Sequence, residues 1–334
     1  MTRRPDDKAA RLGYKADQQV ALEEKGLLPF QQAVALPWGM PAVFLTASAK
    51  RRAQTPCRAS GTRRYLLSLR VVSWNINSIR QRLEHVARFT AEWQPDVLCL
   101  QETKVRDEEF PVADLVEMGF EHCIFRGQKS YNGVAILSRI PFDAQDHRIW
   151  CSKDDKRHLS VTLPFGRGEP IEIHNFYVPS GGPTPDPEVN ARFAHKLSFL
   201  EEMADWASVH TRGRRVLLVG DLNVAPLEKD VWNHKRQLRS VGHTPGESER
   251  IAALLEAGAL IDVGRHFVPP DKPLYTWWAY RFPQSFQRDY GWRLDHAFAS
   301  EPLRAALQRL SIVRETRAWE RPSDHVPVVV DLAS

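Results

Sequence analysis

The chain has 334 residues, of which 43% are hydrophobic and 26% charged, an ordinary composition for one large globular domain or two smaller ones. No stretch reaches the ~18 to 20 continuous apolar residues of a membrane span, which excludes an integral membrane protein. Residues 1–69 hold 12 Lys and Arg against 5 Asp and Glu, so the remaining residues hold 34 basic and 36 acidic ones. Nucleic-acid binding must therefore rest on local patches and a site, not on the net charge of +5.

The first 69 residues differ from the rest of the chain. They hold basic clusters and short apolar runs, without strand alternation or a secretory signal pattern. One hypothesis is a basic tail that tethers the protein to nucleic acid. We favour the alternative that residues 1–69 are a poorly ordered extension, or result from a start site placed too far upstream. Residues 70–334 are then expected to form a single domain.

From residue 70, short apolar strands alternate with amphipathic helices, as in an α/β layered fold. Helical spacing of apolar residues predicts helices at 79–89, 189–207 and 247–257. The predicted strands are 71–74, 97–100, 132–138, 159–163, 171–178, 216–219, 294–299, 310–314 and 326–331. The run 216–219 is apolar throughout, which is typical of a strand covered on both faces.

The cysteines are scattered, with no CxxC pair and no disulfide-like spacing. They are Cys57, Cys99, Cys123 and Cys151. This usage predicts free thiols in a reducing compartment, and we expect a cytoplasmic protein.

Polar side chains stand beside five of the predicted strands, at the points where these strands begin or end. They are Asn75, Glu102, Asp221, Asn223, Asp295, Asp324 and His325. Strand ends converge on one edge of a layered sheet, so these residues can share a pocket. Each alone has a simpler interpretation, because Asp or Asn after a strand is usually a turn or a helix cap. The coincidence of five strand ends favours a site.

The residue types of this set predict a metal-dependent phosphodiesterase. Carboxylate and amide oxygens, with one imidazole and no thiolate, favour Mg²⁺ or Mn²⁺ over zinc. The metal offsets phosphate charge while a carboxylate or imidazole deprotonates water. Four carboxylates would repel an anionic phosphodiester unless a cation or a shared proton offset their charge.

Several strings follow one another in a specific order between about residues 70 and 332. They are Ser73-Trp74-Asn75-Ile76-Asn77, Leu100-Gln101-Glu102-Thr103-Lys104, Gly220-Asp221-Leu222-Asn223, Tyr275-Thr276-Trp277-Trp278-Ala279-Tyr280-Arg281, Arg293-Leu294-Asp295 and Ser323-Asp324-His325. In this order they resemble the exonuclease III family of AP endonucleases. The GDxN and SDH strings alone indicate the wider endonuclease/exonuclease/phosphatase superfamily, and the LQETK and WWxYR strings narrow the resemblance to this branch.

The resemblance implies a four-layered α/β sandwich, in which two packed mixed β-sheets are flanked by helices, as in DNase I-like proteins. It implies a base-excision repair enzyme that cuts 5′ to abasic sites in double-stranded DNA, with 3′→5′ exonuclease and 3′-end trimming activity. The implied cofactor is Mg²⁺, with Mn²⁺ as an alternative, and the implied protein is a monomer that needs no membrane. The balance of the two activities and the number of metal ions stay open.

The same resemblance implies roles for individual residues, with a metal pocket centred on Glu102. The expected metal ligands are Asn75, Glu102, Asp221, Asn223, Asp324 and His325. The expected catalytic residues are Tyr177, Asp221, Asn223, Asp295 and His325. Among them Asp295 would orient His325, and the sequence does not decide whether His325 or Asp221 is the base.

An aromatic segment resembles the wall of a pocket for a baseless sugar, which would exclude intact nucleotides by size. The expected DNA contacts are Trp277, Trp278, Arg281, Arg293, Lys129 and Arg157. The alternative is that Trp278 belongs to the core and that the basic residues are solvated charges. Ser78 stands where many relatives have Gly, which suggests a turn without positive φ.

Two other functions are compatible with parts of the pattern. A phosphatase acting on inositol polyphosphates, or a sphingomyelinase-like enzyme, would share the GDxN and SDH strings but would not need Trp277 or the LQETK string. A non-catalytic DNA-binding scaffold built on a decayed site would have lost ligands, and none of the expected ligands is missing from the sequence.

Overall fold

A computed structural model of the chain describes residues 66–282 and 284–334. Cys57 and nearly all of the predicted extension lie outside the described residues. Cys99, Cys123 and Cys151 carry free thiols, as predicted. In this part of the chain no helix has the length and apolar character needed to cross a membrane.

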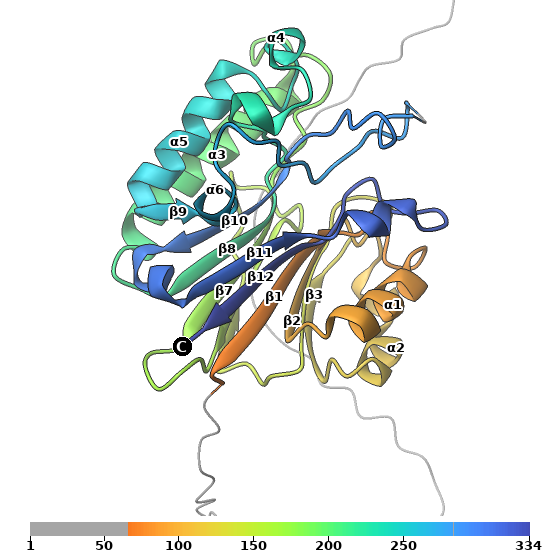
Figure 1. The fold of residues 1–334 in the computed structure, drawn as a ribbon, viewed down its shortest axis with the longest axis vertical. Coiled ribbons are helices and arrows are strands. Elements are labelled where there is room, and N and C mark those ends of the chain that lie inside the picture. The colour runs from red at the N-terminus through yellow and green to blue at the C-terminus, as the bar shows by residue number, and fades with distance from the viewer. Residues whose placement is uncertain (1–65, 283) are drawn as a thin grey trace, which may run out of the picture. The chain divides into compact units, whose positions relative to one another are not determined.

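Two six-stranded β-sheets form the centre of the fold (Figure 1). The first sheet, in the order β11-β12-β1-β2-β4-β3, consists of β1 (Ser68–Asn75), β2 (Val97–Gln101), β3 (His122–Arg126), β4 (Val134–Ser138), β11 (Leu307–Ile312) and β12 (Val328–Ala333). The second, in the order β5-β6-β7-β8-β10-β9, consists of β5 (Ala144–Asp146), β6 (His158–Leu163), β7 (Ile171–Tyr177), β8 (Val216–Asp221), β9 (Leu260–Asp262) and β10 (Asp295–Ser300). The β1–β2 and β7–β8 pairs are parallel and the other pairs antiparallel, so both sheets are mixed.

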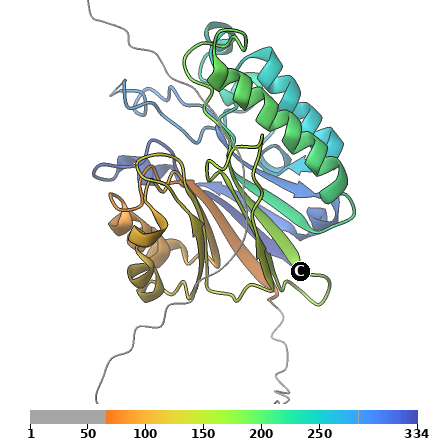
Figure 2. The same ribbon diagram turned by 180° about the vertical axis from the view of Figure 1, so that it is seen from behind.

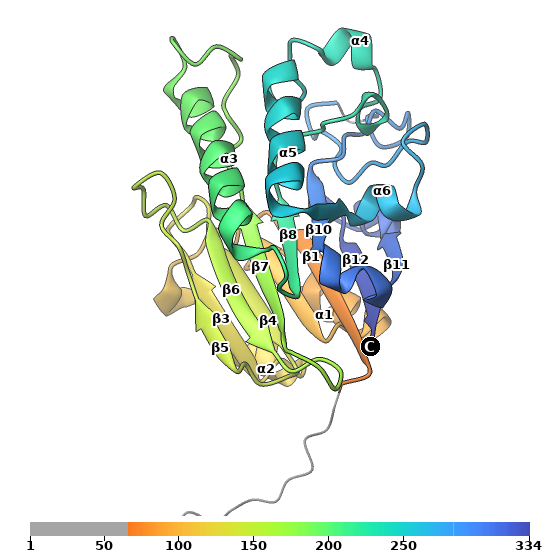
Figure 3. The same cartoon turned by 90° about the vertical axis from the view of Figure 1, so that its left-hand side faces the viewer.

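Helices cover the outer face of each sheet, as Figures 2 and 3 show from two further sides. The first sheet carries α1 (Leu83–Trp93) and α2 (Val112–Glu117), and the second carries the paired helices α3 (Ala191–His210) and α5 (Pro245–Gly258). The connections contain α4 (His234–Gln237), α6 (Val263–Phe267), η1 (Asp107–Glu109), η2 (Glu228–Asp230), η3 (Glu301–Ala306) and η4 (Arg314–Ala318). The layers are helix, sheet, sheet and helix, which is the predicted four-layered α/β sandwich.

Alternating side chains of each central strand divide the core into separate layers. In β1, Val71 packs between the two sheets, whereas Val72 packs beneath the helices of the first sheet. In β8, Leu217 packs between the sheets and Leu218 packs against the helices of the second. Because both faces of β8 are covered, its apolar run 216–219 is buried throughout, as predicted.

Side-chain caps set the start of the two long helices on the second sheet. The Asn190 side chain accepts backbone N–H bonds in the first turn of α3, and Thr244 and Glu247 form a reciprocal capping box at the start of α5. The helix predicted from Val189 therefore begins two residues later, and Val189 itself is 75% exposed.

The parallel pairs bring the carboxyl ends of β1, β2, β7 and β8 to one edge of the sandwich. β1 runs parallel to β2, and β7 runs parallel to β8. A hydrogen bond of 2.9 Å from Asn75 at the end of β1 to Asp221 at the end of β8 joins the two sheets at this edge. The antiparallel strand β10 begins there with Asp295, directly opposite Asp221. Topology therefore collects the polar strand ends in one place.

Candidate active site

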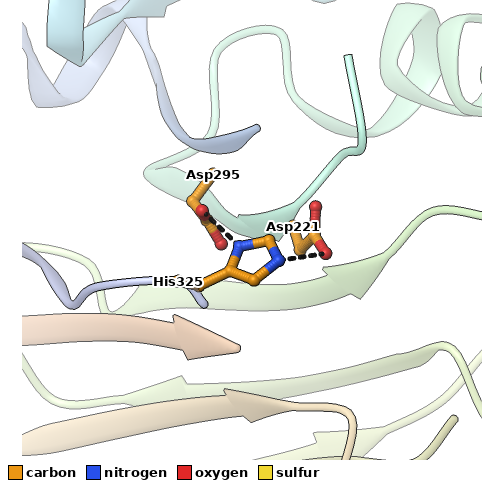
Figure 4. A group of neighbouring side chains, drawn as sticks. All are labelled: Asp221, Asp295 and His325. Carbon is orange, nitrogen blue, oxygen red and sulfur yellow. Dashed lines mark hydrogen bonds and ion pairs between the residues drawn. The ribbon is translucent and has the colours of Figure 1, made fainter. Parts of the chain in front are cut away.

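Asp221, Asp295 and His325 form a buried cluster at this edge (Figure 4). Nδ1 of His325 lies 2.8 Å from Oδ2 of Asp295, and its Nε2 lies 3.7 Å from Oδ2 of Asp221. None of the three residues is more than 5% exposed. The β8–β10 ladder pairs Asp221 with Asp295, and it thereby places one carboxylate on each side of the imidazole.

Asn75, Glu102 and Tyr177 connect this cluster to the first sheet. The Asn75 Nδ2 group donates to Oε1 of Glu102 and to Oδ2 of Asp221, each at 2.9 Å. The Tyr177 hydroxyl, at the end of β7, donates to the same Oε1 at 2.8 Å. Predicted residues from four strand ends thus lie in one hydrogen-bonded group.

Lys104 and Asn77 also belong to this group, although the sequence analysis did not select them. The Lys104 Nζ atom lies 2.6 Å from Oε2 of Glu102 and 2.6 Å from Oδ1 of Asn77. Asn77 donates to Oδ1 of Asp324 at 2.9 Å, and the Trp277 indole N–H donates to Oδ2 of Asp324 at 2.9 Å. Both missed residues stand inside the strings that carried the resemblance, and that position was the available signal.

Asn223 follows β8 directly, and hydrogen bonds hold it on both sides. Its backbone N–H donates to Oδ1 of Asp221 at 2.9 Å, and its Nδ2 group donates to the carbonyl oxygen of Val178 at 2.9 Å. A side-chain amide carries two N–H donors. The second hydrogen atom on Nδ2 forms no hydrogen bond with residues 66–282 or 284–334, so it can be donated to a ligand.

Left-handed backbone conformations are concentrated around the site. Positive φ angles occur at Asn77 (48°), Ser78 (87°), Glu102 (52°), Lys104 (52°) and Asn223 (55°). Such conformations cost non-glycine residues on the order of 1–3 kcal/mol and persist where the surroundings impose them. The prediction of a Ser78 turn without positive φ is wrong. The Ser78 N–H donates to the Glu102 carbonyl oxygen at 2.7 Å, and this bond holds the turn.

Burial and nearby charge give Asp221, His325 and Tyr177 unusual pKa values. Burial raises the pKa of Asp221, and the neighbouring Asp295 and Glu102 carboxylates help to bring it to about 7. Burial alone would lower the pKa of His325, but Asp295 and Asp221 outweigh burial and raise it to about 10. Burial also raises the pKa of Tyr177 well above its usual value. At neutral pH the imidazole is therefore a cation and the Tyr177 hydroxyl keeps its proton.

The donor atoms of the site suit a hard divalent cation. They come from Asn75, Glu102, Asp221, Asp295, Asp324 and His325. Oxygens outnumber the single imidazole, and no cysteine takes part, which is the donor chemistry that alkaline-earth ions prefer. The Lys104 ammonium forms an ion pair with Glu102, so this carboxylate already binds one positive charge.

Of the predicted DNA contacts, three are exposed or half-buried and a fourth lies beside the site. Lys129 and Arg281 are exposed, and Trp277 is half-buried. The Arg157 guanidinium stacks 4.8 Å from the centroid of the Tyr177 ring, so it lies against a predicted catalytic residue.

Arg293 and Trp278 are buried, and the prediction that they contact DNA is wrong. Arg293 is 2% exposed, and its guanidinium is bonded to the carboxylates of Asp230 and Asp262. Trp278 is 0% exposed and packs edge-on against Phe286, with ring centroids 5.1 Å apart. Neither side chain can meet a ligand without unfolding its surroundings, so both belong to the support of the site.

Residues 72–325 match the Endonuclease/Exonuclease/phosphatase family, and the chain belongs to this family. Exodeoxyribonuclease III of Haemophilus influenzae is 29% identical over 276 residues, which cover 78% of this chain and 98% of that protein. The structure of an AP endonuclease from Archaeoglobus fulgidus matches with a TM-score of 0.72 and 31% identity, over 78% of this chain and 98% of the other. The 3′-5′ exonuclease (NExo) from Neisseria meningitidis matches with a TM-score of 0.72 and 33% identity, over 80% and 100%. Within the wider family the chain therefore belongs to the exonuclease III family of AP endonucleases, and the predicted family and fold class are confirmed.

Proposed function

We propose that this protein is a divalent-metal-dependent AP endonuclease that cuts double-stranded DNA 5′ to abasic sites and also degrades and trims 3′ ends. The observation that carries this proposal is the buried Asp221–His325–Asp295 cluster joined to Glu102, in a chain of the exonuclease III family. The proposed catalytic domain is residues 70–334. We further propose that the protein acts as a monomer on chromosomal DNA, in the cytoplasm at the nucleoid.

We assign Mg²⁺, which Mn²⁺ can replace, to Glu102, Asp324 and Asn75. When bound, the cation would offset the charge of the carboxylates and the phosphodiester and would polarise the phosphate oxygens. This assignment leaves Asp221 and His325 to act on water and phosphate. Lys104 would add a second positive charge beside Glu102.

The attack on phosphorus requires a group that removes a proton from water. Asp221 is the proposed base, because its pKa of about 7 lets the carboxylate take up a proton near neutral pH. The imidazole of His325, with a pKa of about 10, already carries a proton. The new phosphorus–oxygen bond forms as the bond to the 3′ oxygen breaks. The leaving 3′ oxygen takes up a proton and becomes a hydroxyl, while the phosphate stays with the abasic sugar.

The charge that develops on the phosphate needs donors that are already in place. The His325 imidazolium, held by Asp295 at 2.8 Å, is the proposed cation at the scissile phosphate. The second Nδ2 hydrogen of Asn223 is the proposed neutral donor. The Tyr177 hydroxyl, which donates its single proton to Glu102 in this structure, is the proposed third contact and would turn that proton toward the phosphate. Hydrogen bonds to the protein hold the His325 ring and the Asn223 amide in place.

Trp277 is proposed to form a wall of the pocket for the baseless sugar. Its indole N–H is bonded to Asp324, so the ring is fixed beside the proposed metal ligands. A fixed aromatic wall admits a small sugar and excludes a nucleotide by size. Lys129 and Arg281, which are exposed, and Arg157 beside Tyr177 are proposed phosphate contacts.

The test uses a duplex with a tetrahydrofuran abasic analogue, an intact duplex and a duplex with a recessed 3′ end, each in Mg²⁺ or EDTA. We expect Mg²⁺-dependent incision 5′ to the analogue and Mg²⁺-dependent degradation of the recessed end. Asp221→Asn should lower kcat by about 10²- to 10⁴-fold. The matched control is Asp271→Asn, at a carboxylate whose side chain is 70% exposed, and it should keep the wild-type rate. Incision that persists in EDTA, or an Asp221→Asn variant as fast as the wild type, would contradict the proposal.

A further inference from the structure

A charged side chain is buried directly behind the loop that carries Asn223. Lys196, in the middle of α3, is 0% exposed, and its ammonium forms an ion pair with Glu247 of α5, which is also 0% exposed. The same Nζ atom donates to the backbone carbonyl oxygen of Asn223 at 2.7 Å. Gly181 leaves room for the lysine stem, because a Cβ atom at that position would lie 3.0 Å from Cδ of Lys196.

Glu247 is tied to a second segment of the same loop system. Its carboxylate accepts the Gly242 N–H at 2.9 Å and the Thr244 hydroxyl at 2.7 Å. The Gly242 carbonyl oxygen in turn accepts the Ala225 N–H at 2.7 Å, two residues after Asn223. The ion pair therefore holds the segment 223–225 both directly, through Lys196, and indirectly, through the turn at Gly242.

A buried ion pair contributes little net stability between two helices, because removing the charges from water costs free energy. Well-packed apolar residues of similar volume often stabilise a fold as well or better. The neighbouring side chains of α3, such as Phe199 and Leu200, join α3 to the core by apolar packing alone. What an apolar residue at position 196 cannot supply is a donor to the Asn223 carbonyl. Asn223 has φ of 55°, and its N–H is already bonded to Asp221. The lysine thus holds the other side of a residue in a strained conformation.

We propose that Lys196, supported by Glu247, is a positioning residue that holds the Asn223 side-chain amide toward the scissile phosphate. Without the ammonium, the carbonyl oxygen of Asn223 loses its donor, and the peptide after Asn223 can rotate. The amide then moves away from the position in which it meets the phosphate. This inference rests on the role of Asn223 in the proposed function.

The test compares Lys196→Met, Glu247→Gln and the double variant on the abasic duplex, with thermal unfolding of each. Lys196→Met should lower kcat by about 10- to 100-fold with little change in KM, as a small misplacement of a catalytic group does. The double variant removes both buried charges, so it should recover much of the stability that Lys196→Met loses. Its kcat should stay low, because the Asn223 carbonyl still lacks a donor. The double variant also carries the test if Lys196→Met alone fails to fold.

Two further variants separate positioning from simple stability. Met203→Ala, on the same buried face of α3, should lower the unfolding temperature and keep the wild-type kcat at temperatures where it is folded. In an Asn223→Ala background, Lys196→Met should cause no further loss of kcat, because the group that it positions is gone. A double variant that regains kcat together with stability, or an equal loss in the Asn223→Ala background, would overturn the inference. If the wild type does not cut, or Asn223→Ala cuts as fast as the wild type, the proposed function fails instead.

Discussion

Two buried histidines, His296 and His325, differ in protonation because of the groups around them. His325 lies between two carboxylates, and they hold its proton. His296, one residue after Asp295 in β10, donates to the Val224 carbonyl oxygen at 2.7 Å. Burial lowers the pKa of His296 to about 4, with Arg293 acting in the same direction. At neutral pH the first ring is therefore charged and the second is neutral.

The neutral state of His296 makes the stability of the fold depend on pH. Unfolded His296 takes up a proton near pH 6.5, whereas folded His296 does so only near pH 4. Between these values the unfolded chain binds more protons than the folded one. As the pH drops from 6.5 to 4, His296 therefore lowers the free energy of unfolding by about 3 kcal/mol. His296→Gln, which can still donate to Val224, should remove that part of the loss. Urea unfolding from pH 7 to pH 4 measures it.

The control for this prediction is His147→Gln, because His147 is exposed. That variant should follow the wild-type dependence of stability on pH. An unchanged dependence in His296→Gln would show that other groups cause the loss of stability in acid.

The exposure of Arg293 and Trp278 and the backbone angle of Ser78 were predicted incorrectly from the sequence. Arg293 has the chemistry of a phosphate contact, and Trp278 stands beside Trp277, but both side chains point into the protein. Residue type and spacing do not give the direction of a side chain in a loop. The positive φ of Ser78 is likewise imposed by a hydrogen bond to Glu102, a residue 24 positions away in the sequence. The strand-end residues were predictable because strand direction decides their position.

At the level of elements, the long central strands and helices were predictable, and the short edge strands were not. β1, β2 and β8 contain apolar runs because both of their faces are covered. The edge strands β5 and β9 have only three residues each, too few for a recognisable alternation. Every strand end that carries a candidate catalytic residue belongs to the predictable group.

The start of β10 depends on an ion-pair cluster formed by several elements. Arg293 binds Asp230 of η2 and Asp262 of β9, and Arg265 of α6 also pairs with Asp230. Arg293→Met leaves Asp262 without this partner in a buried setting, and we expect the free energy of unfolding to fall by about 3–5 kcal/mol. The rate of incision at temperatures where the variant is folded should stay close to that of the wild type. Urea unfolding and incision assays measure the two effects.

The matched control is the same substitution at an exposed arginine. Arg281→Met should change the free energy of unfolding by no more than about 0.5 kcal/mol and should raise KM for DNA in a salt-dependent way. A variant Arg293→Met that keeps its stability but binds DNA more weakly would restore the role that the sequence suggested.

At the level of the whole molecule, positive charge and catalysis are separated along the chain. Residues 1–69 hold 12 Lys and Arg against 5 Asp and Glu, whereas residues 70–334 have a small negative net charge. All side chains proposed for the chemistry lie in that second region. The hypothesis of a basic tail predicts that the N-terminal region adds electrostatic attraction to DNA and nothing to the chemical step, whereas the alternative of a dispensable extension predicts neither effect.

A variant that begins at Leu66 tests this separation. Its kcat on the abasic duplex should equal that of the full chain, while its KM should be higher at low salt. Each phosphate contact that is lost lowers the slope of log affinity against log salt by about 0.9. At about 0.5 M salt, where screening is strong, the two proteins should give the same KM. A truncated chain with a much lower kcat would show that the first region takes part in catalysis.

The pairing of β1 with β12 has a consequence for the order of events during synthesis. β1 lies between β12 and β2, with Ser68 opposite Ala333, so the first sheet lacks β12 and β11 beside β1 until these two strands have been synthesised. Asn75 comes from β1, and His325 comes from the segment just before β12. Contacts of such long sequence separation form late. A growing chain that has not yet reached residues 323–325 therefore lacks a complete site, and we expect it not to cut DNA.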